Sequence, residues 1–236
     1  MLEAYGLSDP GCVRTNNEDS YFIDPSLGLY LLADGMGGAQ AGETASRLAI
    51  ETAVGYLKPF DARTPDNLAK AFEEANKAIL AKAATESELN GMGTTMVGVM
   101  ECGNDLAICS VGDSRVYLFE NGALAPITED QTWANEVGRR LGIDDDRLKT
   151  HPMRHVLTMA IGVDATLRIH SYVVRPATGA IFLLCSDGLH GVVSAENITE
   201  GLKNSATMES ACHYLVEAAK NSGGPDNVTV VLLRKA

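Results

Sequence analysis

Four aspartates stand at the ends of apolar runs that have the composition of β-strands, and each has a glycine close by. They are Asp34 in Ala-Asp-Gly-Met-Gly-Gly, Asp113 in Gly-Asp-Ser-Arg, Asp187 in Ser-Asp-Gly and Asp226 in Gly-Pro-Asp-Asn. Aspartates gathered at strand ends would form an oxygen-rich, negatively charged cup, which suits hard divalent cations. The sequence therefore predicts a metal site at the heart of the fold.

Each of these motifs also has a plain structural explanation when it is taken alone. Asp113 could be only a hairpin-turn residue, and Asp187-Gly188 and Pro225-Asp226 are ordinary turn dipeptides. The glycine-rich stretch 34–38 lacks the Lys-Ser/Thr of a P-loop and the spacing of a dinucleotide-binding loop, so it fits a loop that brings backbone close to a bound ion, but taken alone it could equally be a turn with a solvated aspartate. Three other candidates also have a plain explanation. Glu18 and Asp19 could be exposed acids, and Arg14 could be a surface cation.

Periodic apolar positions predict four helices that would carry these segments into place. Residues 43–57 repeat apolar side chains at helical spacing and would bury one face. A second helix should begin with Thr64 as its N-cap and Pro65 at its first position. Two more are expected over residues 195–202 and 208–221.

Short apolar and β-branched runs predict eight strands. Two short connections suit antiparallel hairpins, namely residues 101–104 and the turn at 120–122, which contains Asn-Gly. Early helices, a run of hairpins and then further helices do not make the regular alternation of a parallel sheet. We therefore expect an α+β fold of antiparallel sheets covered by helices. The expected strands are residues 21–23, 29–33, 94–100, 106–111, 116–119, 167–173, 181–185 and 228–233.

The charged segment 130–154 has the least regular pattern, and we expect it to be a mobile surface segment. Asp144, Asp145 and Asp146 do not match the spacing of a calcium-binding loop and are expected to lie in a solvated loop. The histidines show no metal-ligand spacing, so structural or surface roles are expected for all of them.

Size and composition restrict the class of protein. The chain has 236 residues without a linker or repeat, and its aspartate motifs extend over most of it, so we expect a single domain over residues 1–236. A net charge of −12 argues against nucleic acid or an anionic membrane as a partner. The five cysteines lack zinc-site spacing and are expected to be reduced. With no signal peptide or membrane-spanning run in the sequence, a cytoplasmic protein is expected.

Seven motifs stand in a fixed order along the chain. In that order and spacing they resemble the metal-dependent serine/threonine protein phosphatases of the 2C type, in their bacterial form. The resemblance extends from about residue 5 to residue 233. The motifs are Arg14-x-x-Asn17-Glu18-Asp19, Asp34-Gly35-Met36-Gly37-Gly38, Gly91-Met92-Gly93-Thr94-Thr95, Gly112-Asp113-Ser114-Arg115, Leu157-Thr158-x-Ala160-x-Gly162, Ser186-Asp187-Gly188 and Gly224-Pro225-Asp226-Asn227.

The resemblance implies a four-layer α-β-β-α sandwich, in which two stacked antiparallel sheets are flanked by helices. It also implies a binuclear Mn²⁺ or Mg²⁺ centre at one end of the sandwich. Asp34 would bridge the two ions. Glu18 and the carbonyl group of Gly35 would complete the coordination of one ion, and Asp187 with Asp226 that of the other.

The resemblance also assigns the remaining candidates. Asp113, together with Asp187, would hold a third, weaker ion, Asp19 would orient metal-bound water, and Arg14 would bind the substrate phosphate. This set implies hydrolysis of phosphoserine and phosphothreonine by a water or hydroxide that bridges two ions. The substrates would be phosphorylated proteins that serine/threonine kinases modify, and a monomer is expected.

Three positions depart from the family pattern. Met36 stands where eukaryotic members carry a histidine proposed as a general acid, so we expect the leaving oxygen to take its proton from metal-bound water. Ala39 replaces a histidine of many bacterial members, and a substrate contact there is not carried over. Gln131 replaces a histidine that precedes a flap-like segment at about 130–156, so flap behaviour is not carried over either.

Two other classes of protein fit part of the pattern. A catalytically inactive, phosphatase-like module that binds phosphoproteins for regulation usually lacks the metal carboxylates, whereas all of them are present here. A divalent-metal-binding protein without catalysis would not need the phosphate clamp expected at Arg14. Hydrolysis of p-nitrophenyl phosphate in the presence of Mn²⁺ separates the three classes.

Overall fold

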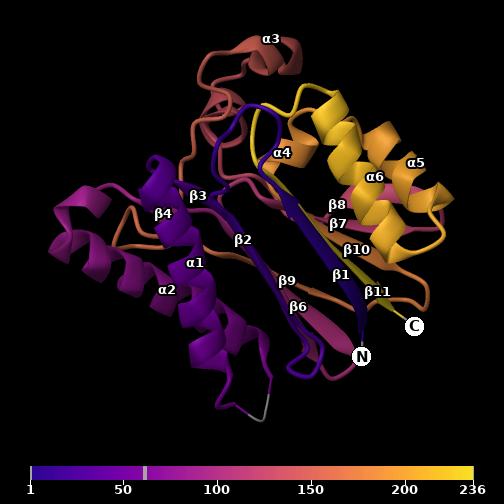
Figure 1. The fold of residues 1–236 in the computed structure, drawn as a ribbon, viewed down its shortest axis with the longest axis horizontal. Helices are drawn as coiled ribbons and strands as arrows, with labels where there is room; N and C mark the ends of the chain where they lie inside the picture. The colour runs from indigo at the N-terminus through magenta and orange to yellow at the C-terminus, as the bar shows by residue number, and fades with distance from the viewer. Residues whose placement is uncertain (1, 61–62, 236) are drawn as a thin grey trace.

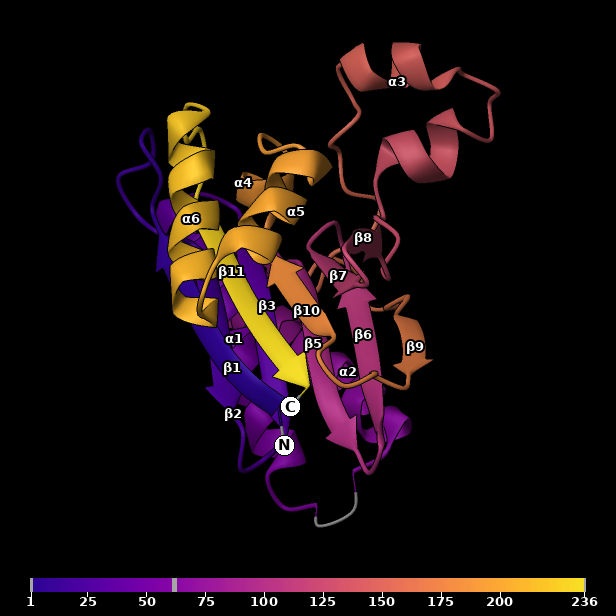
Figure 2. The same cartoon turned by 90° about the vertical axis from the view of Figure 1, so that its right-hand side faces the viewer.

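Two antiparallel sheets stack face to face, and helices cover the outer side of each (Figures 1 and 2). The computed structural model describes residues 2–60 and 63–235, and the side chain of Ala39 lies outside the described part. The four-layer α+β sandwich expected from the sequence is confirmed.

The first sheet contains both ends of the described chain. Its strands follow the order β1 (Leu2–Asp9), β11 (Val228–Lys235), β10 (Ile181–Cys185), β7 (Arg115–Glu120) and β8 (Ala123–Pro126). Residues from the start of the chain therefore pair with residues from its end, with Asp9 opposite Val228. This pairing brings the segments after β1 and before β11 to the same end of the sandwich.

The second sheet has the order β2 (Asp19–Asp24), β3 (Leu29–Met36), β5 (Met96–Cys102), β6 (Asp105–Val111) and β9 (His170–Val174). A short strand, β4 (Gly93–Thr94), pairs with the end of β3. Tight hairpins join β2 to β3 and β5 to β6.

The outer layers differ between the two sheets. α1 (Ala39–Leu57) and α2 (Pro65–Thr85) cover the second sheet, whereas α5 (Ala195–Asn204) and α6 (Met208–Asn221) lie over the first (Figure 1). The remaining helical elements are a 3₁₀-helix at Ser87–Leu89, a π-helix at Ala134–Gly138, α3 (Asp145–Thr150) and α4 (Asp187–His190). Among the described residues, no helix is long and apolar enough to cross a membrane.

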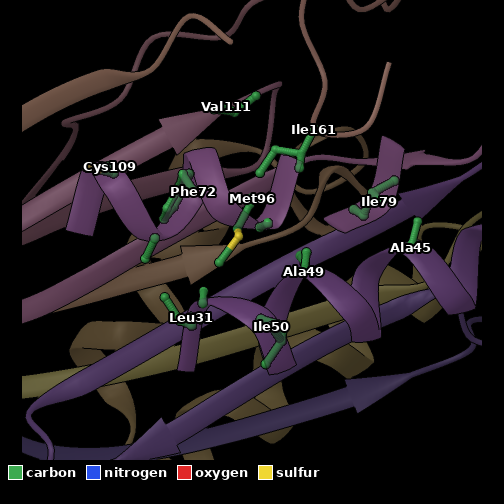
Figure 3. Close-up of a cluster of buried hydrophobic side chains, with 14 of the residues drawn as sticks. Leu31, Ala45, Ala49, Ile50, Phe72, Ile79, Met96, Cys109, Val111 and Ile161 are labelled. Atoms are coloured by element: carbon green, nitrogen blue, oxygen red, sulfur yellow. The ribbon is translucent and has the colours of Figure 1, made fainter. Parts of the chain in front are cut away.

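The central strands are apolar on both faces because each face is covered. In β3, Leu29 and Leu31 pack with α1 and α2, while Tyr30 and Leu32 point into the layer between the sheets. Figure 3 shows the helix-side cluster, in which Leu31, Ala49 and Phe72 come from β3, α1 and α2. Full burial of such a side chain contributes roughly 1.5–3 kcal/mol, so these layers fix the positions of the strand ends.

Most predicted elements are confirmed within a few residues. α2 begins at Pro65 behind Thr64, whose side chain accepts a hydrogen bond from the backbone N–H of Asn67 in a capping box. α6 occupies the predicted range, and the turn at Asn121-Gly122 connects β7 to β8 with positive φ at both residues. Local capping and turn chemistry made these boundaries predictable.

The structure adds to or differs from the sequence analysis at three places. The segment at 130–154 contains two helical elements, and Asp144 caps α3 by accepting a hydrogen bond from the backbone N–H of Arg147. The aspartates at 144–146 are therefore a helix start, although they are exposed as expected.

β1 and β8 were not predicted, because β1 contains Gly6 and polar residues and β8 is a short edge strand. Asp113 does not lie in a hairpin, since β6 and β7 belong to different sheets.

Candidate active site

A cavity of about 250 Å³ opens at one end of the sandwich and collects most of the residues singled out in the sequence. Its carboxylates come from both sheets, since Glu18 precedes β2 and Asp34 lies in β3, while Asp187 follows β10 and Asp226 precedes β11. The lining residues are Arg14, Glu18, Asp34, Gly35, Met36, Gly37, Gly38, Thr95, Asp113, His155, Leu157, Asp187, Asp226 and Asn227.

The register of β2 and β3 places Asp19 directly opposite Asp34. Asp19 is 8% exposed, and one of its oxygens accepts a 2.8 Å hydrogen bond from the hydroxyl group of Ser186. Its other oxygen, Oδ1, has no hydrogen-bond partner among the described residues. A buried carboxylate oxygen without a partner is costly, so this atom requires water or a cation nearby.

Glu18 and Gly35 form a crowded corner of the cavity. The backbone N–H of Gly35 donates to the carbonyl oxygen of Glu18 at 3.1 Å, and a Cβ atom on Gly35 would overlap the carbonyl group of Gly42. A Cβ atom on Gly42 would in turn overlap the Glu18 carboxylate. Both glycines are therefore needed for the first turn of α1 to approach Glu18 this closely.

Asp187 is the first residue of α4, where the helix N-terminus favours a negative charge. Its side chain lines the cavity together with that of Asp34, which comes from the other sheet. A Cβ atom on Gly188 would overlap the carbonyl oxygen of Asn227, so the start of α4 packs tightly on the segment that carries Asp226.

Burial and mutual repulsion raise the pKa values of three of these carboxyl groups, namely those of Asp19, Asp34 and Asp187. Burial raises the pKa of Asp34 well above its ordinary value, and the neighbouring Asp19 and Asp187 raise it further. Burial also raises the pKa of Asp19 to about 7, and burial and then the charge of Asp226 raise the pKa of Asp187. A nearby cation would stabilise the ionised forms and lower these pKa values.

Asp113 lies where the chain crosses from one sheet to the other. It is 6% exposed, and burial, followed by the charge of Asp187, raises its pKa to about 8. The ring of His190 is within 3.0 Å of the carbonyl oxygen of Asp113, and burial lowers the pKa of His190 to about 4. His190 is therefore neutral at pH ~7 and has the structural role expected from the sequence.

Arg14 lies at the mouth of the cavity and contacts Asp226. Its guanidinium donates a 2.8 Å hydrogen bond to the Asp226 carboxylate, and the charge of Asp226 raises the pKa of Arg14. Both side chains are partly exposed, at 47% and 37%. The two residues therefore meet at the entrance, where a ligand can reach both.

The donor set fits hard divalent cations. The cavity is lined by carboxylates from Glu18, Asp34, Asp187 and Asp226, with no cysteine among its lining residues. Oxygen-rich sites of this kind favour Mg²⁺ or Mn²⁺ over zinc. Among the described residues, however, no three His, Cys, Asp or Glu side chains already close around one point. The carboxylates share a cavity without closing around a single point.

The structure adds residues that the sequence did not single out for the site. His155 lines this cavity and also a larger neighbouring one of about 1120 Å³, so it marks the junction between them. Asn227 belongs to one of the seven motifs, but the resemblance assigns it no role. Leu157 and Thr95 also line the cavity. No spacing rule finds His155, because its place depends on how residues 130–156 return to the sheets.

The larger cavity lies between the segment 130–156 and the sandwich. It shares Asp113 and His155 with the smaller cavity and is lined by both charge signs. Arg115 forms a 2.6 Å ion pair with Asp130 there, and Gln131 is fully buried. The carboxamide of Gln131 accepts from the backbone N–H of Gly112 and donates to the carbonyl oxygen of Arg168. Gln131 thus anchors the start of the segment.

The fold and the cavity can be compared with known proteins. The family model described as Protein phosphatase 2C matches residues 13–232. Serine/threonine protein phosphatase PstP of Mycobacterium tuberculosis is 42% identical over 238 residues, covering 98% of this chain and 45% of PstP. Serine/threonine phosphatase stp of Listeria monocytogenes is 34% identical, covering 99% of this chain and 96% of the relative. The chain therefore spans about half the length of PstP.

A solved structure of the PstP catalytic domain in complex with two manganese ions superposes with a TM-score of 0.87 at 36% identity. The match covers 99% of this chain and 97% of that chain. The fold and the extent of these matches define the class of protein, which is that of bacterial PPM-type phosphatases. The chain belongs to the protein phosphatase 2C family.

Proposed function

We propose that this chain is a metal-dependent serine/threonine protein phosphatase that hydrolyses phosphoserine and phosphothreonine in proteins. The observation that carries the proposal is the convergence of Arg14 with Glu18, Asp34, Asp187 and Asp226 in one cavity. Family membership supports it, as does the activity in the names of relatives that match over nearly the whole chain.

The carboxylates would hold two Mn²⁺ or Mg²⁺ ions, as the PstP catalytic domain does with manganese. We assign Asp34 to both ions, Glu18 and the carbonyl group of Gly35 to one, and Asp187 with Asp226 to the other. Bound in this way, the ions supply an activated water near neutral pH and offset charge on the phosphate. The high pKa values of the buried aspartates support this assignment, because a cation compensates the charge that burial penalises.

The other cavity residues have roles in positioning and binding. Arg14 would bind the phosphate oxygens with its planar fork of N–H groups and offset their negative charge. Asp19, held by Ser186, would accept a hydrogen bond from the attacking water through its free oxygen. Asp113 would share a third, weaker ion with Asp187. Met36 has no proton to donate, so the chain itself supplies no acid at that position.

A folded substrate needs room beside the phosphate site. We infer that the cavity of about 1120 Å³ under the flap-like segment 130–156 receives the polypeptide around the phosphorylated residue. Residues 1–236 would form one catalytic domain that acts as a monomer in the cytoplasm. Its partners would be phosphoproteins made by serine/threonine kinases, and neither nucleic acid nor a membrane is required.

The test compares the wild-type protein with Asp34→Asn on a phosphothreonine peptide and on p-nitrophenyl phosphate, each with Mn²⁺. We expect release of inorganic phosphate by the wild type alone. Binding of the phosphopeptide without any release would favour the inactive regulatory module. Binding of Mn²⁺ with neither binding nor turnover of the phosphopeptide would favour a metal-binding protein without catalysis.

A further inference from the structure

The side chain of Asn227 makes three hydrogen bonds to distant parts of the chain, and no role assigned above uses them. Its Oδ1 atom accepts from the backbone N–H of Glu18 at 2.8 Å. Its Nδ2 atom donates to the carbonyl oxygens of Asn16 at 2.8 Å and Pro10 at 3.1 Å. These partners are 209, 211 and 217 positions away in the sequence.

The surroundings of Asn227 select an asparagine in a single orientation. The residue is 5% exposed, and its carboxamide faces one N–H group and two carbonyl groups. Turning the amide over would set its NH₂ group against an N–H and its oxygen against two carbonyl oxygens. An aspartate would keep the bond to Glu18 but lose both donors.

All three bonds end on the segment 10–18, which carries both Arg14 and Glu18. The backbones meet there too, since the N–H of Cys12 donates to the carbonyl oxygen of Gly224 at 2.8 Å. A Cβ atom on Gly11 would overlap the carbonyl oxygen of Asp226. The segment is thus held in direct contact with the turn that carries Asp226.

The contact between the segment 10–18 and the turn 224–227 brings charged groups of both signs together, and the hydrogen bonds of Asn227 hold it. It brings Glu18 on one side toward Asp187 and Asp226 on the other, all lining the same cavity. Carboxylates of like charge repel one another in a partly buried site, whereas Arg14 on the same segment pairs with Asp226 at 2.8 Å. Hydrogen bonds in a buried environment are stronger than in water, and Asn227 supplies three of them.

We propose that Asn227 is a positioning residue for the phosphatase reaction. Its carboxamide fixes the segment 10–18 against the turn 224–227, so that Glu18 and Arg14 face the carboxylates of the other sheet. This inference rests on the proposed function for its catalytic meaning, whereas the mechanical connection stands on the geometry alone.

Asn76 provides a matched control. It is also a buried asparagine, 2% exposed, that connects distant segments. Its side chain accepts from the backbone N–H of Gly162 at 2.6 Å and donates to the carbonyl oxygen of Asp164 at 2.9 Å. Asn76 lies on α2 and does not line the cavity. Asn227→Ala and Asn76→Ala therefore remove similar buried amides from different places.

The first measurement is hydrogen–deuterium exchange of the metal-stripped full chain, followed over peptides that cover residues 10–18. We expect faster exchange in Asn227→Ala and wild-type exchange there in Asn76→Ala. The second is Mn²⁺ titration by calorimetry, in which Asn227→Ala should bind about tenfold more weakly and Asn76→Ala as the wild type does. Unchanged exchange and unchanged Mn²⁺ affinity in Asn227→Ala would overturn the proposal. So would equal effects of the two variants.

If Asn227→Ala does not fold, Asn227→Asp tests whether the carboxamide of Asn227 fixes the segment 10–18. It preserves the size of the side chain and the acceptor for Glu18, and it replaces two donors by an oxygen that repels two carbonyl groups. We expect it to increase exchange over residues 10–16, and wild-type exchange there would overturn the proposal. Hydrogen–deuterium exchange does not depend on turnover. If the wild-type protein were inactive on phosphopeptides, the proposed function would be refuted, but the exchange result for Asn227 would be unaffected.

Discussion

Arg14 and Asp226, 212 positions apart in the sequence, form a 2.8 Å ion pair at the mouth of the carboxylate cavity. In the proposed function the first residue binds phosphate and the second binds a metal ion, so each would exchange its present partner for a ligand. Both side chains are partly exposed, and ion pairs of that kind contribute little to stability. The pair is therefore a contact that ligands can replace at small cost.

Arg14→Ala should act on phosphate binding and leave the fold intact. We expect KM to rise by ~10-fold or more for a phosphopeptide and for p-nitrophenyl phosphate, because a charge-assisted contact of this kind contributes roughly 1.5–3 kcal/mol. Since the substitution also frees Asp226, Mn²⁺ affinity should not fall. Steady-state kinetics with saturating Mn²⁺ checks this, and an unchanged KM for both substrates would make Arg14 a surface cation.

Asp34→Asn and Asp226→Asn should each lower kcat by at least ~10³-fold, because the loss of one ligand disrupts the two-ion arrangement around the attacking and leaving oxygens. Asp19 and Asp187 repel a negative charge on Asp34, so a neutral side chain at this position should leave the fold intact. Circular dichroism and thermal unfolding control for folding. Near wild-type kcat in folded Asp34→Asn would exclude the proposed bridging role.

Asp113→Asn separates a third ion site from a structural role. The residue lies at a crossing between the sheets, so the hairpin-turn explanation no longer applies. We expect a clear loss of phosphopeptide turnover with folding intact and two tightly bound ions retained, because the other ions have ligands of their own. Calorimetric Mn²⁺ titration and kinetics on the same protein check this. Wild-type turnover at every Mn²⁺ concentration would remove Asp113 from the site.

The aspartates also predict how stability depends on pH in the metal-stripped protein. Folding raises the pKa of Asp19 from 3.8 to about 7 and that of Asp113 from 3.8 to about 8. At pH values between the unfolded and the folded pKa of each group, the folded state keeps a proton that the unfolded chain has released. The free energy of unfolding therefore falls as pH rises through this range. We expect Tm in EDTA to be lower at pH ~8 than at pH ~5 by about 4 °C or more. Mn²⁺ should reduce this difference, and a Tm that rises with pH in EDTA would contradict the raised pKa values.

The sequence predicted what depends on local chemistry and on motif order. The start of α2 followed from Thr64 and Pro65, and most of the charged residues that line the cavity, though not His155, belong to the motifs of the family resemblance. It could not predict contacts made by tertiary packing. The bonds of Asn227 to Glu18 and Asn16 depend on how β1 pairs with β11, and the crossing at Asp113 depends on which strands β7 joins. β1 was missed because its residues alternate too weakly to identify a strand.

The most direct test of the account is turnover of a phosphothreonine peptide by protein that has been rigorously stripped of metal. Phosphate release should be absent in EDTA and should return when free Mn²⁺ or Mg²⁺ is added in excess, because in the proposed function the attacking water is activated by ions that the carboxylates of this cavity would hold. Recovery with Mn²⁺ in the wild type and no recovery in Asp34→Asn is the predicted result. Full turnover by the stripped wild-type protein, with no ion added, would contradict the account.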